Sequence, residues 1–411
     1  MGDCVEPAHR AAERVARESY GRLLAFLAAR TRNVAGAEDA LADAFAAALR
    51  TWPGRGVPDN PDAWILTAAR RRQVDAVRRR QTQVAGEPHL QRMTEELELA
   101  SGESGEIPDR RLALMFTCAH PAIDPAARTP LMLQTVLGLP ADAIAAAFLV
   151  PPATMGQRLV RAKTRIARAG IPFRVPERDE LPERLDAVLT AIYAAYTRGW
   201  SDAGEDGPSP LADEALWLAD LVVSLLPSEP EAKGLLALML YAESRRIARR
   251  TEAGAYVPLN QQDVSLWDMR RLRMAEALLH EANAGGPTGR YQLEAAIQSA
   301  HMAGRFSGQD TSRQVLALYD RLLALTASPV VSLNRAVALA AVEGPFAALA
   351  AIDTLGADKR MASYQPYWAA RGQLLAAAGY SADAREALTV AIGLSTDDAA
   401  RRHLEAIISR L

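Results

Sequence analysis

The sequence predicts an all-α protein, and three observations support this fold class. Apolar residues recur at spacings of three and four along most of the chain, as in ERVARESYGRLLAFLAAR and DEALWLADLVVSLL, which is the period of an amphipathic helix. Alanine, leucine and arginine dominate, whereas alternating strand patterns are scarce. Proline and glycine lie mostly between the periodic segments, where they end helices.

The chain of 411 residues is too long for one compact core, and its length predicts roughly two or three domains. We expect a helical block over residues 10–81, an acidic linker over 82–108 and a second helical block over 109–175. After a proline-rich joint, a helical extension is expected over 181–411.

Composition predicts a soluble cytoplasmic protein. The formal net charge is only -2, and the two cysteines are too few for a disulfide framework. The first residues contain no apolar core of signal-peptide length, and no later run reaches the roughly 20 apolar residues that span a bilayer. We therefore expect no membrane contact.

A basic helix is predicted to begin at Asn60 and Pro61, a helix cap followed by proline at the first helical position. Six arginines crowd this helix around a single acid, Asp75; they are Arg70, Arg71, Arg72, Arg78, Arg79 and Arg80. A solvated face would usually mix signs, whereas same-sign charges repel one another unless a polyanion neutralises them. The cluster therefore favours a nucleic-acid surface.

Two features flank this helix. The preceding segment, from Trp52 to Asn60, is expected to be a loop, and its aromatic and polar groups, which include Asp59, suit an unstacked base. Further upstream an acidic and apolar patch suits a basic protein partner, although complementing the helix dipole would also explain two of its acids. The patch comprises Glu38, Asp39, Asp43 and Phe45.

A helix-turn-helix is predicted in LPADAIAAAFLVPPATMGQRLVRAKTRIARAG, with a turn at Leu149 to Pro151. Its expected buried positions are Ile144, Ala145, Met155 and Leu159. No acidic residue lies between Asp142 and Glu177, which a bare helix pair would not explain. The candidate DNA contacts are Thr154, Gln157, Arg158, Arg161, Lys163 and Arg165.

The end of the chain matches the tetratricopeptide pattern of small and large residues in paired helices. The matching positions are Trp368, Gly372, Leu375, Ala384, Leu388 and Ala391. An ordinary alanine-rich helical bundle remains the alternative.

The two basic blocks together resemble the extracytoplasmic function (ECF) sigma factors. GAEDALADAFAAAL followed by NPDAWILTAARRRQVDAVRRR is similar to region 2 of that family, and ADAIAAAFLVPPATMGQRLVRAKTRI is similar to region 4. The further helical block resembles the subgroup with large C-terminal extensions. The chain departs from the usual family pattern at Ala42, Leu149 and Ala153.

The resemblance implies core RNA polymerase and promoter DNA as partners. It assigns the acidic patch to the polymerase clamp helices, the Trp52–Asn60 segment with Trp64 and the arginines to the -10 element, and the helix-turn-helix to the -35 element and the polymerase flap. It places the acidic linker toward the polymerase active centre. We also expect the extension to contact the sigma regions within the chain and to regulate them.

Two other classes of protein remain as alternatives. A helix-turn-helix activator with a repeat-built sensor explains residues 130–411 but not the basic helix, and a scaffold explains only the C-terminal half. Cys118 and His120 are too few ligands for a zinc site. We therefore expect no enzyme, no cofactor and no metal.

Overall fold

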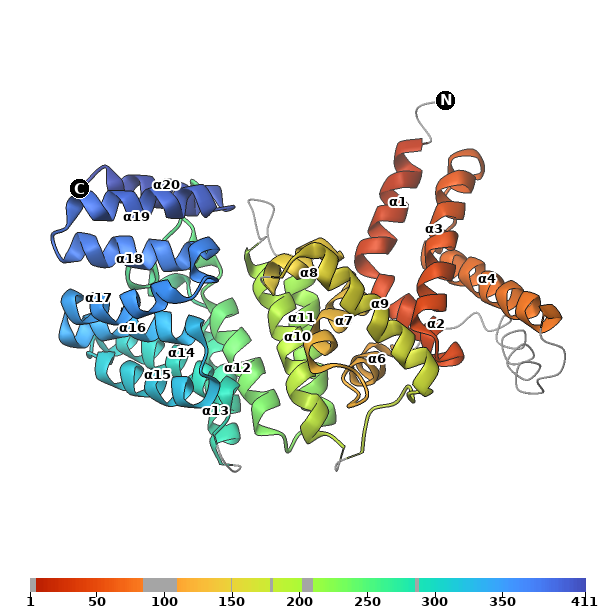
Figure 1. The fold of residues 1–411 in the computed structure, drawn as a ribbon, viewed down its shortest axis with the longest axis horizontal. Coiled ribbons are helices and arrows are strands. Elements are labelled where there is room, and N and C mark those ends of the chain that lie inside the picture. Colours follow the sequence, from red (N-terminus) through yellow and green to blue (C-terminus); the bar gives the residue numbers. More distant parts are fainter. Residues whose placement is uncertain (1–4, 84–108, 149, 178–179, 202–209, 285–287) are drawn as a thin grey trace. The chain divides into compact units, whose positions relative to one another are not determined.

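The computed structural model describes residues 5–83, 109–148, 150–177, 180–201, 210–284 and 288–411 (Figure 1). Regular structure in these residues is helical, and the one β-bridge found in them joins Arg250 to Tyr256. The predicted all-α fold class is confirmed.

Contacts divide the chain into two compact units. The first comprises residues 1–199 and 210–215, and the second comprises residues 200–209 and 216–411. The predicted joint near residues 175–181 therefore lies inside the first unit, which continues into the extension.

The first unit begins with four helices that cover the predicted basic block (red to orange in Figure 1): α1 (Val5–Glu18), α2 (Tyr20–Thr31), α3 (Val34–Arg55) and α4 (Pro61–Gln83). Its remaining helices are α6 (Arg111–Cys118), α7 (Pro125–Thr135), α8 (Ala141–Ala147), α9 (Pro152–Ala169), α10 (Pro182–Ser201) and the start of α11 (Pro210–Leu225). Most of the predicted acidic linker, residues 84–108, lies outside the described residues.

Local capping explains where several of these helices start. The Asn33 side chain accepts a hydrogen bond from the Gly36 amide at 3.0 Å and starts α3. Asn60 accepts from the Ala63 amide at 3.0 Å, which places the start of α4 where the sequence predicts it. Such caps provide a hydrogen-bond acceptor for backbone amides of the first turn, which have no partner within the helix.

The segment expected to be a loop from Trp52 to Asn60 is partly helical, and this expectation is wrong in its first half. Helix α3 runs through Arg55 with Pro53 in its last turns, and Gly56 ends it at a φ of 84°. The Trp52 side chain is only 2% exposed. Burial of this indole stabilises the helix and offsets the loss of the hydrogen bond that proline cannot make. The helix therefore continues past Pro53.

Helix α10 packs into the first unit. Thr129 of α7 donates to the Ala187 carbonyl at 3.4 Å, and Arg128 donates to the Glu183 carbonyl at 3.5 Å. The apolar side of α10 is buried at Val188, Leu189, Ala191 and Ile192. The first helix after the proline-rich joint thus completes the core of the unit before it.

The second unit is a succession of helices in which each packs on the next along the chain, and α12 also packs on α14. The helices are α12 (Pro230–Ser244), α13 (Met269–Asn283), α14 (Arg290–Ser307), α15 (Ser312–Thr326), α16 (Pro329–Glu343), α17 (Pro345–Asp353), α18 (Gln365–Ala377), α19 (Ser381–Leu394) and α20 (Asp398–Ile408). Short 3-10 turns lie at Ile247–Arg249, Leu259–Gln261, Val264–Leu266, Thr354–Ala357 and Met361–Ser363.

The last helices cross closely where the sequence pairs small with large residues. A Cβ at Gly372 of α18 would lie 2.7 Å from Cγ of Leu388 in α19, so only glycine fits there without a shift. Ala384, Leu388 and Ala391 are buried. The tetratricopeptide assignment itself stays a prediction.

Among the described helices, none taken singly has the length and apolar character needed to cross a membrane, whereas α8 and α9 as a bent pair meet those two criteria together.

Candidate nucleic-acid interface

Helices α3 and α4 enclose a hollow of about 890 Å³ on the first unit. Its lining includes aromatic, amide and cationic groups from both helices and from the loop between them: Trp52, Asn60, Trp64, Thr67, Arg71 and Arg72. The two indole rings meet edge to face, with centroids 5.5 Å apart and planes at 67°. This pair joins α3 to α4 and leaves Trp64 half-exposed in the hollow.

The predicted -10 residues separate into different environments. Arg71 and Arg72 are exposed and line the hollow, together with Asp75. The Arg70 guanidinium instead lies 4.8 Å from the centre of the Phe26 ring. Consecutive residues of a helix point about 100° apart, so the three side chains of this run do not all share one face.

Other members of this set have structural roles or fall outside the described side chains. Asn60 caps α4, and Asp59 is exposed in the preceding loop but does not line the hollow. The side chains of Arg78, Arg79 and Arg80 lie outside the described residues, although α4 itself runs through Gln83.

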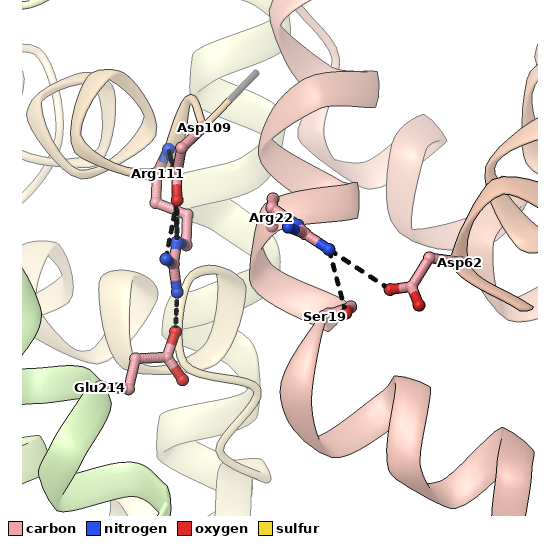
Figure 2. Close-up of polar contacts among 6 residues, drawn as sticks. All are labelled: Ser19, Arg22, Asp62, Asp109, Arg111 and Glu214. Carbon is pink, nitrogen blue, oxygen red and sulfur yellow. Dashed lines mark hydrogen bonds and ion pairs between the residues drawn. The ribbon is translucent and has the colours of Figure 1, made fainter. Parts of the chain in front are cut away.

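The first turn of α4 is held by an ion pair that the sequence did not indicate. Arg22 of α2 extends to Asp62 at 3.5 Å and to the Ser19 hydroxyl at 3.4 Å (Figure 2). Both Arg22 and Asp62 are half-buried. This contact sets the position of the helix that carries Trp64 and the two hollow-facing arginines.

Helices α8 and α9 meet at 112°, the crossing of a helix-turn-helix. The four positions expected to be buried are 2% exposed or less: Ile144, Ala145, Met155 and Leu159. Of the predicted contact residues on α9, Gln157, Arg161 and Arg165 are exposed, and Thr154 and Arg158 are half-exposed. Leu149, in the turn, lies outside the described residues.

Three arginines of α9 share one face beside the start of α7. Arg158, Arg161 and Arg165 line a hollow of about 310 Å³ with Asp124. Arg165 donates to the Ala122 carbonyl at 3.3 Å, and Arg161 donates to the Gln157 carbonyl at 3.2 Å. These bonds hold the two guanidiniums near the hollow, where three cations around one acid attract an anion.

Lys163 does not join this face. Its Nζ lies 2.5 Å from Oε2 of Glu38 on α3, and the two side chains are 14% and 18% exposed. Burial raises the pKa of Glu38, and the charge of Lys163 offsets part of that rise. One predicted DNA contact is thus paired with one predicted polymerase contact.

The remaining acidic-patch residues differ from Glu38. Asp39 and Asp43 are exposed one helical turn apart on α3, whereas Phe45 is half-buried. The structure therefore keeps two carboxylates together on the surface and turns the third toward α9.

A half-buried arginine joins α6 to α11. Arg111 donates to Asp109 at 2.7 Å and also to Glu214, and its side chain is 12% exposed (Figure 2). Burial alone would lower the pKa of Arg111, but the hydrogen bonds and charges of Asp109 and Glu214 outweigh it and raise the pKa. Nothing in the local pattern around Arg111 could indicate a partner 103 residues away.

Cys118 and His120 have separate structural surroundings. The buried Cys118 thiol lies 3.6 Å from the Thr135 hydroxyl, and His120 Nδ1 accepts from the Ala122 amide at 3.1 Å. Within the described ranges, no three His, Cys, Asp or Glu side chains gather in a group that could hold a metal ion.

Comparison with known families gives a match on the helices that build the larger hollow. Residues 15–83 match sigma-70 region 2. This match supports the assignment of the chain as a sigma-70 family factor. The match supports the predicted sigma factor role in RNA polymerase binding and promoter recognition. Sigma factors are non-enzymatic regulators, which agrees with the prediction that the chain is not an enzyme.

One relative is similar over most of the chain. It is 40% identical over 386 residues to "Uncharacterized protein R00370" of Rhizobium meliloti (strain 1021), covering 92% of this chain and 90% of that protein. Residues 184–283, which include α11, α12, α13 and most of α10, match a family of unknown function, DUF6596. No solved structure matches the chain.

Proposed function

We propose that this sigma factor is of the ECF type and directs initiation by contacting the -10 element with the hollow between α3 and α4 and the -35 element with α9. The observation that supports this most directly is the larger hollow, because it combines an aromatic ring with two arginines in the region that matches sigma-70 region 2.

The larger hollow suits an unstacked base. Its volume of about 890 Å³ exceeds what one nucleobase fills, and Trp64 offers a half-exposed ring face on which a base can stack. Arg71 and Arg72 lie at its rim and would neutralise the adjoining phosphates. Unstacking a base from the duplex costs a few kcal/mol. Stacking on the Trp64 ring and neutralisation of the adjoining phosphates would together offset this cost.

Helix α9 suits the major groove. Thr154 and Gln157 are near its N-terminal end, where side chains of a recognition helix reach base edges. Arg158, Arg161 and Arg165 lie on one face beside α7 and would bind backbone phosphates.

For the polymerase, the exposed Asp39 and Asp43 of α3 are the proposed contacts with the clamp helices, and α6–α9 would meet the flap. Binding polymerase places the protein in the cytoplasm. The helical extension after α10 is proposed to regulate the sigma regions, because residues 184–283 match a shared family yet include none of the proposed DNA contacts.

Reconstitution with core RNA polymerase tests the proposal. The full chain plus core should produce RNA from a promoter that core alone ignores, whereas a helix-turn-helix activator would require another sigma factor. Replacing Trp64 with alanine should lower this transcription about tenfold, since stacking is worth about 1–3 kcal/mol per base.

The matched control is Phe346→Ala, which removes an aromatic side chain that is 62% exposed on α17, away from the proposed contacts. It should transcribe like the wild type. Absence of promoter-specific RNA from the full chain plus core, with no other sigma factor present, would refute the sigma role. Equal loss of transcription in the Trp64→Ala and Phe346→Ala variants would exclude the hollow from the promoter contact.

A further inference from the structure

The second unit has a hollow of about 250 Å³ between α14, α15 and α16, and none of the proposed promoter or polymerase contacts lines it. Its walls come from one face of α15 and one face of α16, because the lining residues of each helix are spaced by three, four or seven positions. Those of α15 are Ser312, Val315 and Tyr319, and those of α16 are Asn334, Val337, Ala338 and Ala341. Helix α14 contributes His301.

Contacts around the hollow hold its three helices in place. A Cβ at Gly304 of α14 would lie 2.8 Å from Oγ1 of Thr311 and 3.2 Å from the carbonyl oxygen of Gln309, so the turn before α15 lies directly on α14. On the other side, Nε of Arg335 in α16 lies 2.5 Å from Oδ1 of Asp320 in α15. The hollow is therefore part of the folded unit and does not need a ligand to form it.

Three polar side chains line the hollow without using their hydrogen-bonding groups. In the part of the chain that the structure describes, His301, Tyr319 and Asn334 have no hydrogen-bond partner. Burial and the charge of Arg245 lower the pKa of His301, so its neutral imidazole offers one donor and one acceptor. Burial raises the pKa of Tyr319 to about 12, so its phenol keeps the proton that it can donate.

The surroundings of the hollow favour an uncharged ligand. Of the residues that the structure describes, no acid, lysine or arginine lines it. Glu294, whose charge acts on Tyr319, pairs with Arg290 at 2.7 Å, and Arg245 donates to the Gln298 amide oxygen at 3.4 Å. A charged ligand would lose its hydration here without gaining an opposite charge, which is costly.

We propose that this hollow binds an uncharged small molecule with a single ring, held by hydrogen bonds to His301, Tyr319 and Asn334. The ring would lie on Val315, which is 3% exposed and belongs to the apolar core of α14, α15 and α16. A cavity of about 150 Å³ is enough to bind benzene, so about 250 Å³ admits a ring with a polar substituent. An apolar wall with a few polar groups is the usual composition of such sites.

Three probes of the same shape test the site and its charge preference. Benzamide is neutral, benzoate is an anion and benzamidine is a cation at pH 7, and each is one ring with a planar substituent. The full chain is prepared with isotope-labelled histidine, which gives six NMR signals, and His301→Asn identifies the signal of His301. Benzamide should shift this signal with half-saturation at about 1 mM. The two ions should bind at least about tenfold more weakly.

The absence of a saturable shift with benzamide would overturn the site, and equal binding of the three probes would overturn its preference for an uncharged ligand. Removing one hydroxyl tests the hydrogen bonds. Tyr319→Phe should weaken benzamide binding about fivefold, the effect of one neutral hydrogen bond. The matched control is Tyr380→Phe, because Tyr380 is 50% exposed and does not line the hollow. Equal affinities of the two variants would overturn the bond to Tyr319.

Filling the hollow tests its location. Ala338→Leu places a larger side chain in the hollow and should abolish benzamide binding, whereas Ala317→Leu, at an exposed position of α15 that does not line it, should bind like the wild type. Circular dichroism and a cooperative melt establish that each variant is folded. Benzamide binding retained by a folded Ala338→Leu protein would overturn the site, and Tyr319→Phe decides the question if Ala338→Leu does not fold. Failure of the sigma role would leave these binding results unchanged.

Discussion

Neighbouring residues of one charged run have different environments in the folded chain. Arg70 lies on the Phe26 ring while Arg71 and Arg72 line the hollow, and Glu38 pairs with Lys163 while Asp39 stays exposed. The rotation of about 100° per residue in a helix separates them. Residue-level effects must therefore be predicted from each side chain's own surroundings, and Cys118 offers a clear case.

We expect Cys118 to make stability depend on alkaline pH. Burial raises the pKa of its thiol to about 12, and the hydrogen bond with Thr135 lowers it only in part. The thiol of the unfolded chain has an ordinary pKa of 9.0, so between these two values the folded state keeps a proton that the unfolded state loses. The contribution is therefore present below pH 9 and is lost as pH rises toward 12.

Urea unfolding at pH 8 and pH 10 measures this effect. The free energy of unfolding should fall more in the wild type than in Cys118→Ala, by about 1.4 kcal/mol, which is the value of one pKa unit. Other groups that titrate in this range, such as buried tyrosines, contribute equally to both proteins. Their contribution therefore disappears from the difference between the two decreases. Equal decreases in the two proteins would show that the thiol titrates alike in both states.

At the scale of the element, α9 combines three functions on separate faces. Its apolar side packs on α7 and α8, one exposed side carries Arg158, Arg161 and Arg165, and Lys163 points to α3. The spacing of three and four residues brings the arginines together. The arginine face of α9 can therefore bind phosphates without any change in the apolar side of the helix or in its contact with α3.

We expect the double variant Arg158→Ala, Arg161→Ala to bind promoter duplex more weakly and with less dependence on salt. Each lost phosphate contact lowers the slope of log affinity against log salt by about 0.9, so two contacts lower it by about 1.8. Fluorescence anisotropy over a range of KCl concentrations measures the slope. Arg10→Ala, which removes a cation that pairs with Glu6 on α1, should keep the wild-type slope. The same slope in all three proteins would exclude the two arginines from the interface.

At the scale of the whole molecule, the division into units does not follow the division into proposed functions. Helix α10 belongs to the extension by sequence but contributes its apolar side to the core of the first unit. Arg111 of α6 is likewise held by Glu214 of α11. The start of the expected extension is thus part of the first unit.

A chain that ends at residue 180 should therefore lose cooperative folding of α6–α9. Burying Val188, Leu189 and Ile192 contributes about 5 kcal/mol at about 1.5–3 kcal/mol each, which is comparable with the stability of a domain. A chain that ends at residue 226 keeps α10 and α11 and is the matched control. Hydrogen exchange at α7 should be fast in the shorter chain and slow in the longer one. Equal protection would show that α10 is dispensable for this core.

Local sequence was sufficient for the fold class and for several details of the candidate site. The apolar period predicted helices, Asn60 marked the start of α4, and Ile144, Ala145, Met155 and Leu159 are the buried residues of the α8–α9 crossing. These features follow from backbone periodicity and capping, which involve residues a few positions apart. The extent of α3 past Trp52 did not follow, because burial of that side chain outweighs the effect of Pro53.

The partners of the charged side chains came from the tertiary structure. Glu38 and Lys163 are 125 residues apart, and Arg111 and Glu214 are 103 residues apart. Gly21 is required by the carbonyl of Val136 and not by its own helix. The helical period of the sequence predicts which face of a helix is apolar. Only the tertiary packing determines which other helix covers that face. The sequence therefore predicts which stretches of this chain are charged, whereas the fold decides which of those charged side chains another helix covers.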